Sequence, residues 1–282
     1  MSCKIITVAN QKGGTAKTTS AYNLGHALAE QGSKVLLVDF DPQANMTLCY
    51  GIENPDEEFP SMSDLLSFIV EGKELPPDRF VYVKVKKERP DYDESSDKIA
   101  QAGGSLEIIP SNINLSLAEI NLRDEMEREH ILSQLLEPLR AHYDYCIIDT
   151  SPFLGLLTLN ALVACDSVLI PVSANLWSAT GLQALMEHIY KIKRRLNPKI
   201  EIMGILLTIC DERTKIFKEV KELVSGAYGS NIKIFETAIP ATVKVQESNY
   251  SSKSIIEYDS TNKAAIAYRD FAKEVSNDVK KC

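Results

Sequence analysis

The feature that most constrains the fold is a series of short apolar runs, each followed by a stretch with helical spacing. The runs are rich in β-branched residues and apolar at nearly every position, which indicates strands buried on both faces of a sheet. Alternation of such strands with helices is typical of a parallel sheet covered by helices on both faces. We therefore expect a doubly wound, mostly parallel α/β fold. The expected strands are Ile5–Ala9, Lys34–Asp39, Leu106–Ile109, Tyr145–Asp149, Ser167–Val172, Ile202–Ile209 and Ile232–Thr237.

The same alternation extends along the whole chain and predicts a single domain over residues 1–282. One polar insertion around residues 79–104 interrupts it, and its first part, Phe80–Val85, could form a hairpin or belong to a long loop. The expected helices are Thr18–Glu30, Met62–Val70, Ile113–His142, Ala179–Leu196, Thr214–Ser225 and Lys263–Val279.

Composition narrows the class of protein. The formal net charge is −8, from 31 Lys and Arg against 39 Asp and Glu, which argues against a nucleic-acid binder that is basic over its whole surface. Six scattered cysteines form no Cys-x-x-Cys pair, and the chain starts without a signal-peptide profile. No apolar run approaches the roughly 20 residues that span a bilayer. We expect a soluble cytoplasmic protein with no membrane partner.

A glycine-rich loop, Asn10–Thr19, follows the first expected strand and leads into the first helix. A phosphate-binding loop needs small residues whose N–H groups point at phosphate oxygens, a helix N-terminus, a lysine, and a hydroxyl for Mg²⁺. Gly13, Gly14, Lys17 and Thr18 supply these parts. The strict P-loop pattern is not met, because Gln11 and Ala16 stand where glycines are usual. A simple glycine turn is the alternative reading.

Three carboxylates at strand ends favour the phosphate-binding reading. Asp39 and Asp41 close the second expected strand, and Asp149 closes the apolar strand that begins at Tyr145. Because parallel strands end at one edge of the sheet, these acids should lie near the loop, where Asp149 has the form of a Walker B carboxylate for Mg²⁺. Any one of them alone could instead cap a helix.

These motifs together resemble the deviant Walker A ATPases of the ParA/Soj and MinD type, over nearly the whole chain apart from residues 79–104. The segments that carry the resemblance are Lys12-Gly-Gly-Thr-Ala-Lys-Thr-Thr19, Asp39-Phe-Asp-Pro-Gln-Ala-Asn-Met-Thr47, Asp149–Ala161, Leu206–Thr214, Ile239-Pro240 and Ser254–Asp259.

The resemblance implies a role for each matching residue. Lys12 would reach the partner's phosphates in an ATP-bound homodimer, in the manner of an arginine finger supplied in trans. Lys17 would bind the phosphates of its own subunit, Asp41 would orient the attacking water, and hydrolysis would be slow and dimer-dependent. Mg²⁺ would be held by Thr18, Asp39 and Asp149. The nucleotide would contact Lys12, Gly13, Gly14, Thr15, Ala16, Lys17, Thr18 and Thr19, with adenine near Pro240 and Thr242.

The resemblance also implies non-specific DNA binding by the ATP dimer and stimulation by a ParB-like partner. The matching positions are Arg213 and Lys244, and Lys215 and Lys218 lie within a helical turn of Arg213. A solvated charged helix is the alternative. The denser basic run Lys191–Lys199 ends a helix, where cations also suit the helix dipole, so its contact with DNA is left open.

Two other readings remain. A MinD-like regulator would share the nucleotide site but end in a membrane-binding helix, whereas Lys263–Val279 places acids beside its apolar positions. A nucleotide-gated scaffold with little hydrolysis would follow if Ala16 impairs turnover. Alanine is tolerated at that position if its φ is negative, and a positive φ there would cost on the order of 1 kcal/mol.

Overall fold

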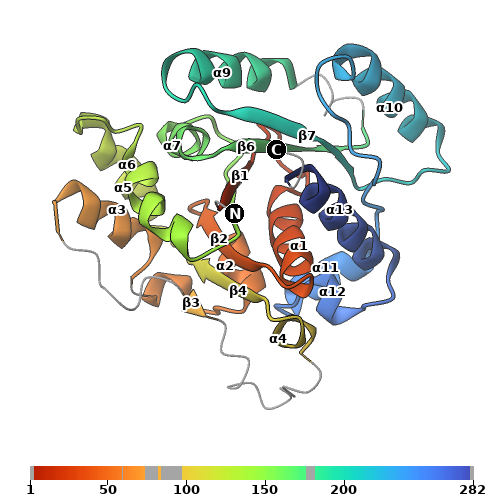
Figure 1. Cartoon of the computed structure of the whole chain (residues 1–282), viewed down its shortest axis with the longest axis horizontal. Coiled ribbons are helices and arrows are strands. Elements are labelled where there is room, and N and C mark those ends of the chain that lie inside the picture. Colours follow the sequence, from red (N-terminus) through yellow and green to blue (C-terminus); the bar gives the residue numbers. More distant parts are fainter. Residues whose placement is uncertain (1–2, 59, 74–81, 84–96, 176–181, 280–282) are drawn as a thin grey trace.

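The computed structural model describes residues 3–58, 60–73, 82–83, 97–175 and 182–279 (Figure 1). A seven-stranded sheet lies at its centre, in the order β3-β4-β2-β5-β1-β6-β7. Six strands are parallel, and only β3 is antiparallel to its neighbour β4. The expected doubly wound α/β fold is confirmed. The strands are β1 (Lys4–Val8), β2 (Lys34–Phe40), β3 (Tyr82–Val83), β4 (Ser105–Ile109), β5 (Tyr145–Thr150), β6 (Ser167–Ser173) and β7 (Glu201–Thr208).

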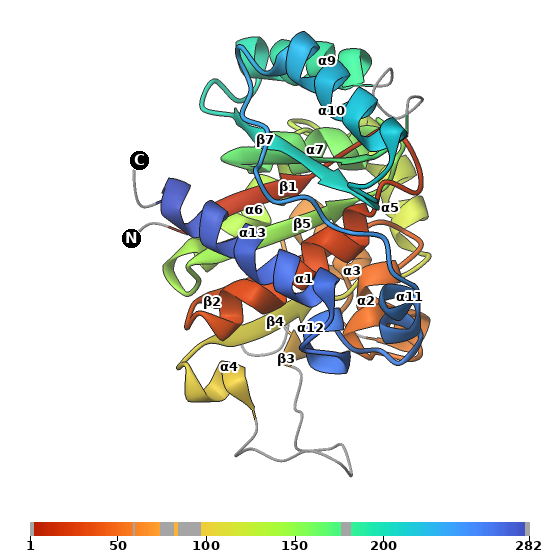
Figure 2. The ribbon, with the colours of Figure 1, turned by 90° about the vertical axis from the view of Figure 1, so that its right-hand side faces the viewer.

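Helices cover both faces of the sheet (Figures 1 and 2). One layer contains α1 (Lys17–Glu30), α2 (Asn45–Tyr50), α4 (Lys98–Gln101), α11 (Val243–Tyr250), α12 (Ile255–Tyr258) and α13 (Lys263–Val279). The other contains α3 (Met62–Val70), α5 (Leu115–Asn121), α6 (Ile131–Leu136), α7 (Leu156–Ala164), α9 (Leu182–Arg195) and α10 (Lys215–Tyr228). Short 3₁₀ turns occur at Pro55–Glu57, Leu122–Asp124 and Glu137–Ala141.

The two helical layers explain why the strands are apolar at nearly every position. Successive strand side chains point to opposite faces. In β2, Leu36 and Val38 enter the hydrophobic core on one side, while Val35 and Leu37 enter the core on the other. All four side chains are completely buried, so neither face of this strand meets water.

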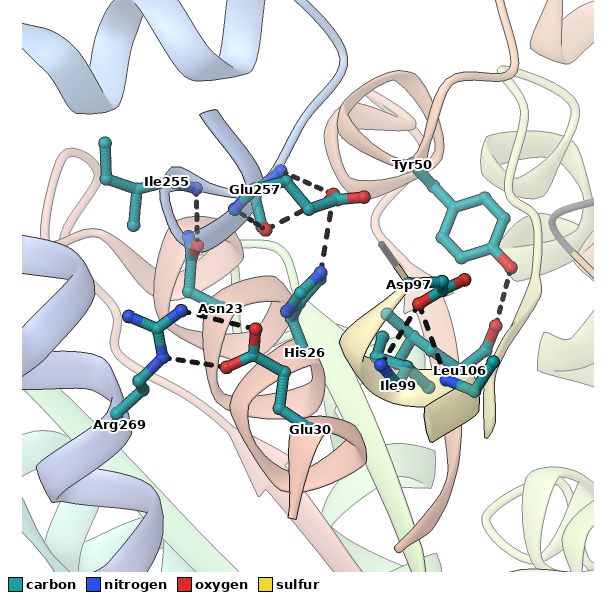
Figure 3. A network of polar contacts seen from close by, with 12 residues as sticks. Asn23, His26, Glu30, Tyr50, Asp97, Ile99, Leu106, Ile255, Glu257 and Arg269 are labelled. Carbon is teal, nitrogen blue, oxygen red and sulfur yellow. Dashed lines mark hydrogen bonds and ion pairs between the residues drawn. The ribbon is translucent and has the colours of Figure 1, made fainter. Parts of the chain in front are cut away.

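A polar network fastens the C-terminal helices to α1 (Figure 3). Figure 2 shows α13 lying beside α1. The guanidinium of Arg269 on α13 donates to both carboxylate oxygens of Glu30, at 2.7 and 3.2 Å. The side-chain oxygen of Asn23 accepts a 2.9 Å bond from the N–H of Ile255, in the first turn of α12. The first helix is therefore held by contacts from the far end of the sequence.

The expected strand Ile232–Thr237 is wrong. This segment makes only an isolated bridge, between Ile234 and Ile205 of β7. The N–H groups of Glu236 and Thr237 instead donate to the carboxylate of Glu274 on α13, at 3.1 and 2.8 Å. Donors taken by a helix side chain cannot extend a strand ladder.

The single helix expected over Ile113–His142 is also wrong. It is divided into α5, α6 and the turns between and after them, because the chain becomes extended at Glu125 and left-handed at Glu127, with φ of 53°. The side chain of Asn160 on α7 fixes the break: it donates to the carbonyl of Arg128 at 2.8 Å and accepts from the N–H of Leu132 at 3.1 Å.

Only parts of the polar insertion lie within the described residues. Tyr82 and Val83 form β3, which pairs with Ile108 and Glu107 of β4 at the edge of the sheet. The rest of the expected Phe80–Val85 hairpin lies outside the described residues. Asp97 caps α4 by accepting from the N–H of Ile99. None of the described helices combines the length and apolar character needed to cross a bilayer.

Candidate nucleotide-binding site

The ends of three strands bring the expected site residues together. In the sheet, Asp149 of β5 is paired in register with Val8 of β1 on one side and with Asp39 of β2 on the other. The loop that follows β1 therefore begins beside both carboxylates. This position, at the carboxyl ends of the central strands, is where doubly wound sheets bind ligands.

Side chains from neighbouring strands hold the loop in place. Asn10 donates to the carbonyl of Pro171 in β6 at 2.7 Å and accepts from the N–H of Lys12 at 3.0 Å. Thr208, the last residue of β7, donates to the carbonyl of Thr15 at 3.0 Å. The loop is thereby fixed to two strands besides the one from which it leaves.

The open side of the loop is lined by backbone. Gly13 and Gly14 are exposed, and a Cβ atom built on either would meet no other atom within 4 Å. Gly14 has a φ of 72°, which favours glycine. The helix α1 begins directly after Ala16, with Thr18 and Thr19 in its first turn, so its free N–H groups face the same region. Open space around Gly13 and Gly14, next to the N-terminus of α1 with its free N–H groups, suits phosphate oxygens.

Ala16 has a left-handed conformation, with φ of 61° and ψ of 36°. The φ of Ala16 is therefore positive, which is the unfavourable alternative for alanine and costs on the order of 1 kcal/mol. Its carbonyl still accepts the first helical hydrogen bond of α1, from the N–H of Ser20 at 2.9 Å.

The side chain of Lys17 is buried at the base of the loop. Its ammonium donates to the carbonyl of Lys12 at 3.3 Å. Burial lowers the pKa of Lys17, and the carboxylates of Asp149 and Asp41 oppose this by stabilising the charged form. An ammonium held in this way is ready to bind an anion.

Asp149 is the most unusual group at the site. It is completely buried, and within the described part of the chain neither carboxylate oxygen has a hydrogen-bond partner. Burial raises the pKa of Asp149 well above its ordinary value, and the nearby Asp39 raises it further, while the Thr18 hydroxyl and Lys17 act in the opposite direction. A buried carboxylate without partners fits a cation ligand.

Asp39 has a different environment. One oxygen accepts from both the N–H and the hydroxyl of Thr47, at 2.8 and 2.7 Å, and the other accepts from the N–H of Asp41 at 3.3 Å. Burial nevertheless raises the pKa of Asp39 to about 6. Since Thr47 lies in the first turn of α2, Asp39 acts here as a helix cap, the alternative that the sequence left open. Its contact with a metal stays a prediction.

Asp41 and Lys12 lie at the mouth of the site. The buried Asp41 carboxylate accepts from the N–H of Gln43 at 3.0 Å, and the ammonium of Lys12 reaches the side-chain oxygen of Asn175 at 3.1 Å. Among the described residues, no group of three or more His, Cys, Asp or Glu side chains could hold a metal. Mg²⁺ ordinarily uses one or two carboxylates plus substrate phosphates, so the residues present fit a Mg²⁺-nucleotide complex.

The expected adenine region lies close to the end of β7. The N–H of Cys210 donates to the carbonyl of Ile239, and the N–H of Ala241 donates back to the carbonyl of Cys210, both at 2.9 Å. Pro240 is bridged to Cys210 in this way, and Thr242 begins α11 by accepting from the N–H of Lys244 at 3.3 Å.

Most of the expected DNA-binding cations are paired with neighbouring acids. Arg213 makes a two-point contact with Asp211, at 2.9 Å for each nitrogen. Lys215 lies 3.3 Å from Glu219, and Lys244 lies 2.7 Å from Glu247. Lys218 is exposed on the same helix as Lys215. The four residues come from α10, α11 and the turn before α10, and their binding to DNA stays a prediction.

Reasoning from the sequence missed several residues that support the site. Asn10 and Thr208 anchor the loop, and Thr47 anchors Asp39. Thr47 ends the motif that begins at Asp39, and its spacing from Asp39 is a signal that the sequence does contain. Thr208 lies within the segment Leu206–Thr214 that carries the resemblance, but nothing in that segment indicates its contact with the loop, because the contact joins residues far apart in the chain.

Comparison with known proteins agrees with this geometry. The sequence profile of the family described as "AAA domain" matches residues 3–202. The sporulation initiation inhibitor protein Soj of Bacillus subtilis is 39% identical over 97% of this chain and 98% of its own length. The chromosome partitioning protein ParA of Caulobacter vibrioides is 35% identical over 96% of this chain and 93% of its own.

The chain belongs to the ParA/Soj family of partition-type ATPases.

One solved structure that is similar to this chain contains a bound nucleotide. The Mycobacterium smegmatis protein described as cobyrinic acid a,c-diamide synthase was crystallised with ADP and magnesium, and it is 31% identical to this chain with a TM-score of 0.78. The match covers 99% of this chain and 96% of that one. This ParA/Soj family member thus shares its fold with a protein that was solved with ADP and magnesium bound.

Proposed function

We propose that this ParA/Soj family member hydrolyses Mg-ATP and uses the cycle to partition DNA in the bacterial cytoplasm. The observation that carries the proposal is that Asp149, a completely buried carboxylate with no hydrogen-bond partner among the described residues, lies close enough to the buried ammonium of Lys17, at the open glycine loop, to stabilise its charge. Such a pair suits a divalent cation and a phosphate chain bound together.

Each residue at the site has a proposed part in hydrolysis. Lys17 binds the β- and γ-phosphates, while the N–H groups of the glycine loop donate hydrogen bonds to the phosphate oxygens. Thr18 and Asp149 hold Mg²⁺, with Asp39 as the further candidate ligand. The bound ion supplies charge that stabilises the phosphoryl oxygens during transfer. Asp41 orients the attacking water.

The proposed active form is a homodimer. Lys12 lies at the mouth of the loop, where its ammonium contacts only the side-chain oxygen of Asn175 among the described residues. An exposed hydrogen bond from an ammonium to a neutral amide oxygen is readily exchanged for one to a charged phosphate of a facing subunit. Adenine lies against Pro240 and Thr242. Because the trans cation arrives only with a second subunit, turnover is slow and depends on dimerisation.

A pair of variants tests this site. Lys12→Ala should still bind ATP but lose dimer-dependent hydrolysis. In the unmodified protein, this hydrolysis is the part of the ATPase rate that rises faster than linearly with protein concentration. Asp41→Ala should accumulate as an ATP-bound dimer, measured by light scattering after size exclusion. Unchanged hydrolysis in Lys12→Ala, or normal turnover in Asp41→Ala, would contradict these assignments.

The proposed DNA surface consists of Arg213, Lys215, Lys218 and Lys244. Fully exposed ion pairs contribute little to stability, so Arg213 and Lys244 can exchange Asp211 and Glu247 for phosphates at little cost. Dimerisation would place two such sets together, which makes DNA affinity conditional on ATP although the chain carries a net charge of −8. A ParB-like partner would stimulate hydrolysis and release the DNA.

DNA retention tests this surface. Arg213→Glu with Lys244→Glu should abolish ATP-dependent, salt-sensitive binding to unrelated DNA while leaving dimerisation intact. The matched control is Lys73→Glu with Lys273→Glu, which reverses two exposed lysines that also pair with neighbouring acids. Equal retention by both double variants would refute the proposed surface.

A MinD-like membrane role is less well supported. The apolar side of α13, including Tyr268, Phe271 and Val275, is completely buried against the core. Glu274 on the same helix is occupied by the N–H groups of Glu236 and Thr237. A helix that has buried its apolar face in the protein cannot also insert that face into lipid. Binding to anionic vesicles without DNA binding would reverse this preference.

The scaffold alternative rests on the strained Ala16. An ATPase assay with and without DNA separates it from the partition proposal, because a scaffold would bind DNA with ATP yet hydrolyse almost none.

A further inference from the structure

A groove is lined by residues of α7, of α9 and of the segment that joins α5 to α6, and by none from the loop Asn10–Thr19. Figure 1 shows how these helices are arranged. Its volume is about 540 Å³, within the range of about 300–1,000 Å³ typical of ligand sites. Its floor is aliphatic and consists of Leu154, Leu156, Leu159, Leu162, Ile192 and Leu196. Four of these leucines are only half-buried, so the floor remains open to an apolar group from outside.

The rim of this α7–α9 groove is positively charged. Arg123, Arg128, Lys191 and Arg195 line it, against the single acid Glu129. Glu129 is already paired with Arg128, at 3.3 Å. Within the described ranges, no ion pair joins any of the other three cations to an acid. The groove therefore combines an apolar floor with uncompensated positive charge.

Two asparagines fix the walls of the groove. Asn160 on α7 bonds to Arg128 and Leu132 and so holds the α5–α6 connection against α7. Asn197, just after α9, donates to the carbonyls of Leu162, Val163 and Cys165 at 3.2, 3.0 and 2.7 Å. The second contact ties the C-terminal end of α7 to that of α9. A groove held at both ends is formed before its ligand binds.

We infer that the α7–α9 groove binds an acidic amphipathic peptide segment of a partner protein. Leucine-like side chains spaced one helical turn apart would cover the aliphatic floor, and Asp or Glu residues beside them would pair with Arg123, Lys191 and Arg195. DNA fits less well, because its phosphates would satisfy the rim but leave six aliphatic side chains uncovered.

The groove also adjoins the segment that leaves the nucleotide site. Leu154 and Gly155 line it, and they follow Asp149 by a few residues. Gly155 is enclosed: a Cβ atom there would lie 2.2 Å from a carboxylate oxygen of Glu119 and 2.8 Å from the ring of Phe153. A bound peptide would therefore press on a tightly packed turn between the Asp149 carboxylate and α7.

Peptide binding without nucleotide tests the inference independently of ATP hydrolysis. The probe is a fluorescent peptide of about twelve residues, with leucines at helical spacing and glutamates between them. Its counterpart carries lysines in place of the glutamates. Fluorescence anisotropy should detect binding of the acidic peptide and not of the basic one.

Charge reversal locates the site. Lys191→Glu with Arg195→Glu should weaken binding of the acidic peptide by about tenfold or more. The matched control, Lys193→Glu with Arg194→Glu, reverses two exposed cations of the same helix that do not line the groove, and it should bind normally. Leu159→Ala should also weaken binding, since it removes part of the apolar floor without a change of charge.

Three results would overturn the inference. One is failure of the acidic peptide to bind the unmodified protein. Another is equal loss of binding in the two double variants, which would indicate a general charge effect. The last is loss of DNA retention in Lys191→Glu with Arg195→Glu while peptide binding is unchanged, which would make the rim a DNA contact.

Discussion

Replacement of Ala16 by glycine should stabilise the protein without nucleotide. A non-glycine residue in the left-handed region is strained by about 1–2 kcal/mol, and Ala16 has a φ of 61°. Glycine removes this strain but loses about 0.4–1 kcal/mol through the greater freedom of the unfolded chain. Loss of the half-buried methyl group subtracts a few tenths of a kcal/mol more. The net gain is about 0.5 kcal/mol, or roughly 1–2 °C in Tm.

The control for this variant is Ala102→Gly. Ala102 is exposed and has a φ of −81°, so glycine relieves no strain there and only the loss of about 0.4–1 kcal/mol remains. Thermal unfolding followed by circular dichroism should move Tm upward for Ala16→Gly and downward for Ala102→Gly. If both variants lower Tm by similar amounts, Ala16 is not strained and the reasoning about the loop is wrong.

Three further perturbations have defined outcomes. Arg269→Ala leaves the half-buried Glu30 without its two-point partner and should lower the free energy of unfolding by about 1–3 kcal/mol. The control, Lys273→Ala, breaks an exposed ion pair and should change the free energy of unfolding by less than about 0.5 kcal/mol. Urea titration measures both values. Folding raises the pKa of Asp39 from 3.8 to about 6, so the folded state favours the protonated carboxyl. This contribution to the free energy of unfolding is complete below about pH 4 and is lost as the pH rises through about 6. The total loss is about 3 kcal/mol. With EDTA present, the urea midpoint of the unmodified protein should fall between about pH 4 and pH 6, and in Asp39→Asn it should fall much less. An equal fall in both proteins would show that Asp39 does not cause this pH dependence. Mg-ATP should raise the Tm of the unmodified protein by several degrees and that of Asp149→Asn much less, and an equal rise in both would remove Asp149 from the metal site.

The sequence predicted the sheet well where burial decides the pattern. The six parallel strands were expected within about two residues of their observed ends, because helices on both faces leave no polar positions in strands such as β2. The helices Met62–Val70 and Lys263–Val279 were expected with their observed bounds. Both have an apolar side that one layer of the core covers.

The errors arise where side chains distant in sequence decide the local structure. Glu274 takes the N–H groups of the expected strand Ile232–Thr237, and Asn160 stabilises the break in the expected helix Ile113–His142. No local pattern contains either contact. The same limit applies at the site: the motif located Asp39 and Asp149 together, but only the contacts of Thr47 distinguish the capped carboxylate from the unpartnered one.

The network between α1 and the C-terminal helices has a consequence for synthesis of the chain. Asn23 and Ile255 are 232 residues apart, and Glu30 and Arg269 are 239 apart. At about 5–20 residues per second, a ribosome needs roughly 10–50 s to make the partners of α1 after α1 itself. Throughout that interval, the helix that begins directly after the glycine loop has no cover on the side where α13 will pack. A nascent chain therefore completes the support of its nucleotide loop only at the end of translation, and until then α1 presents an apolar surface to chaperones.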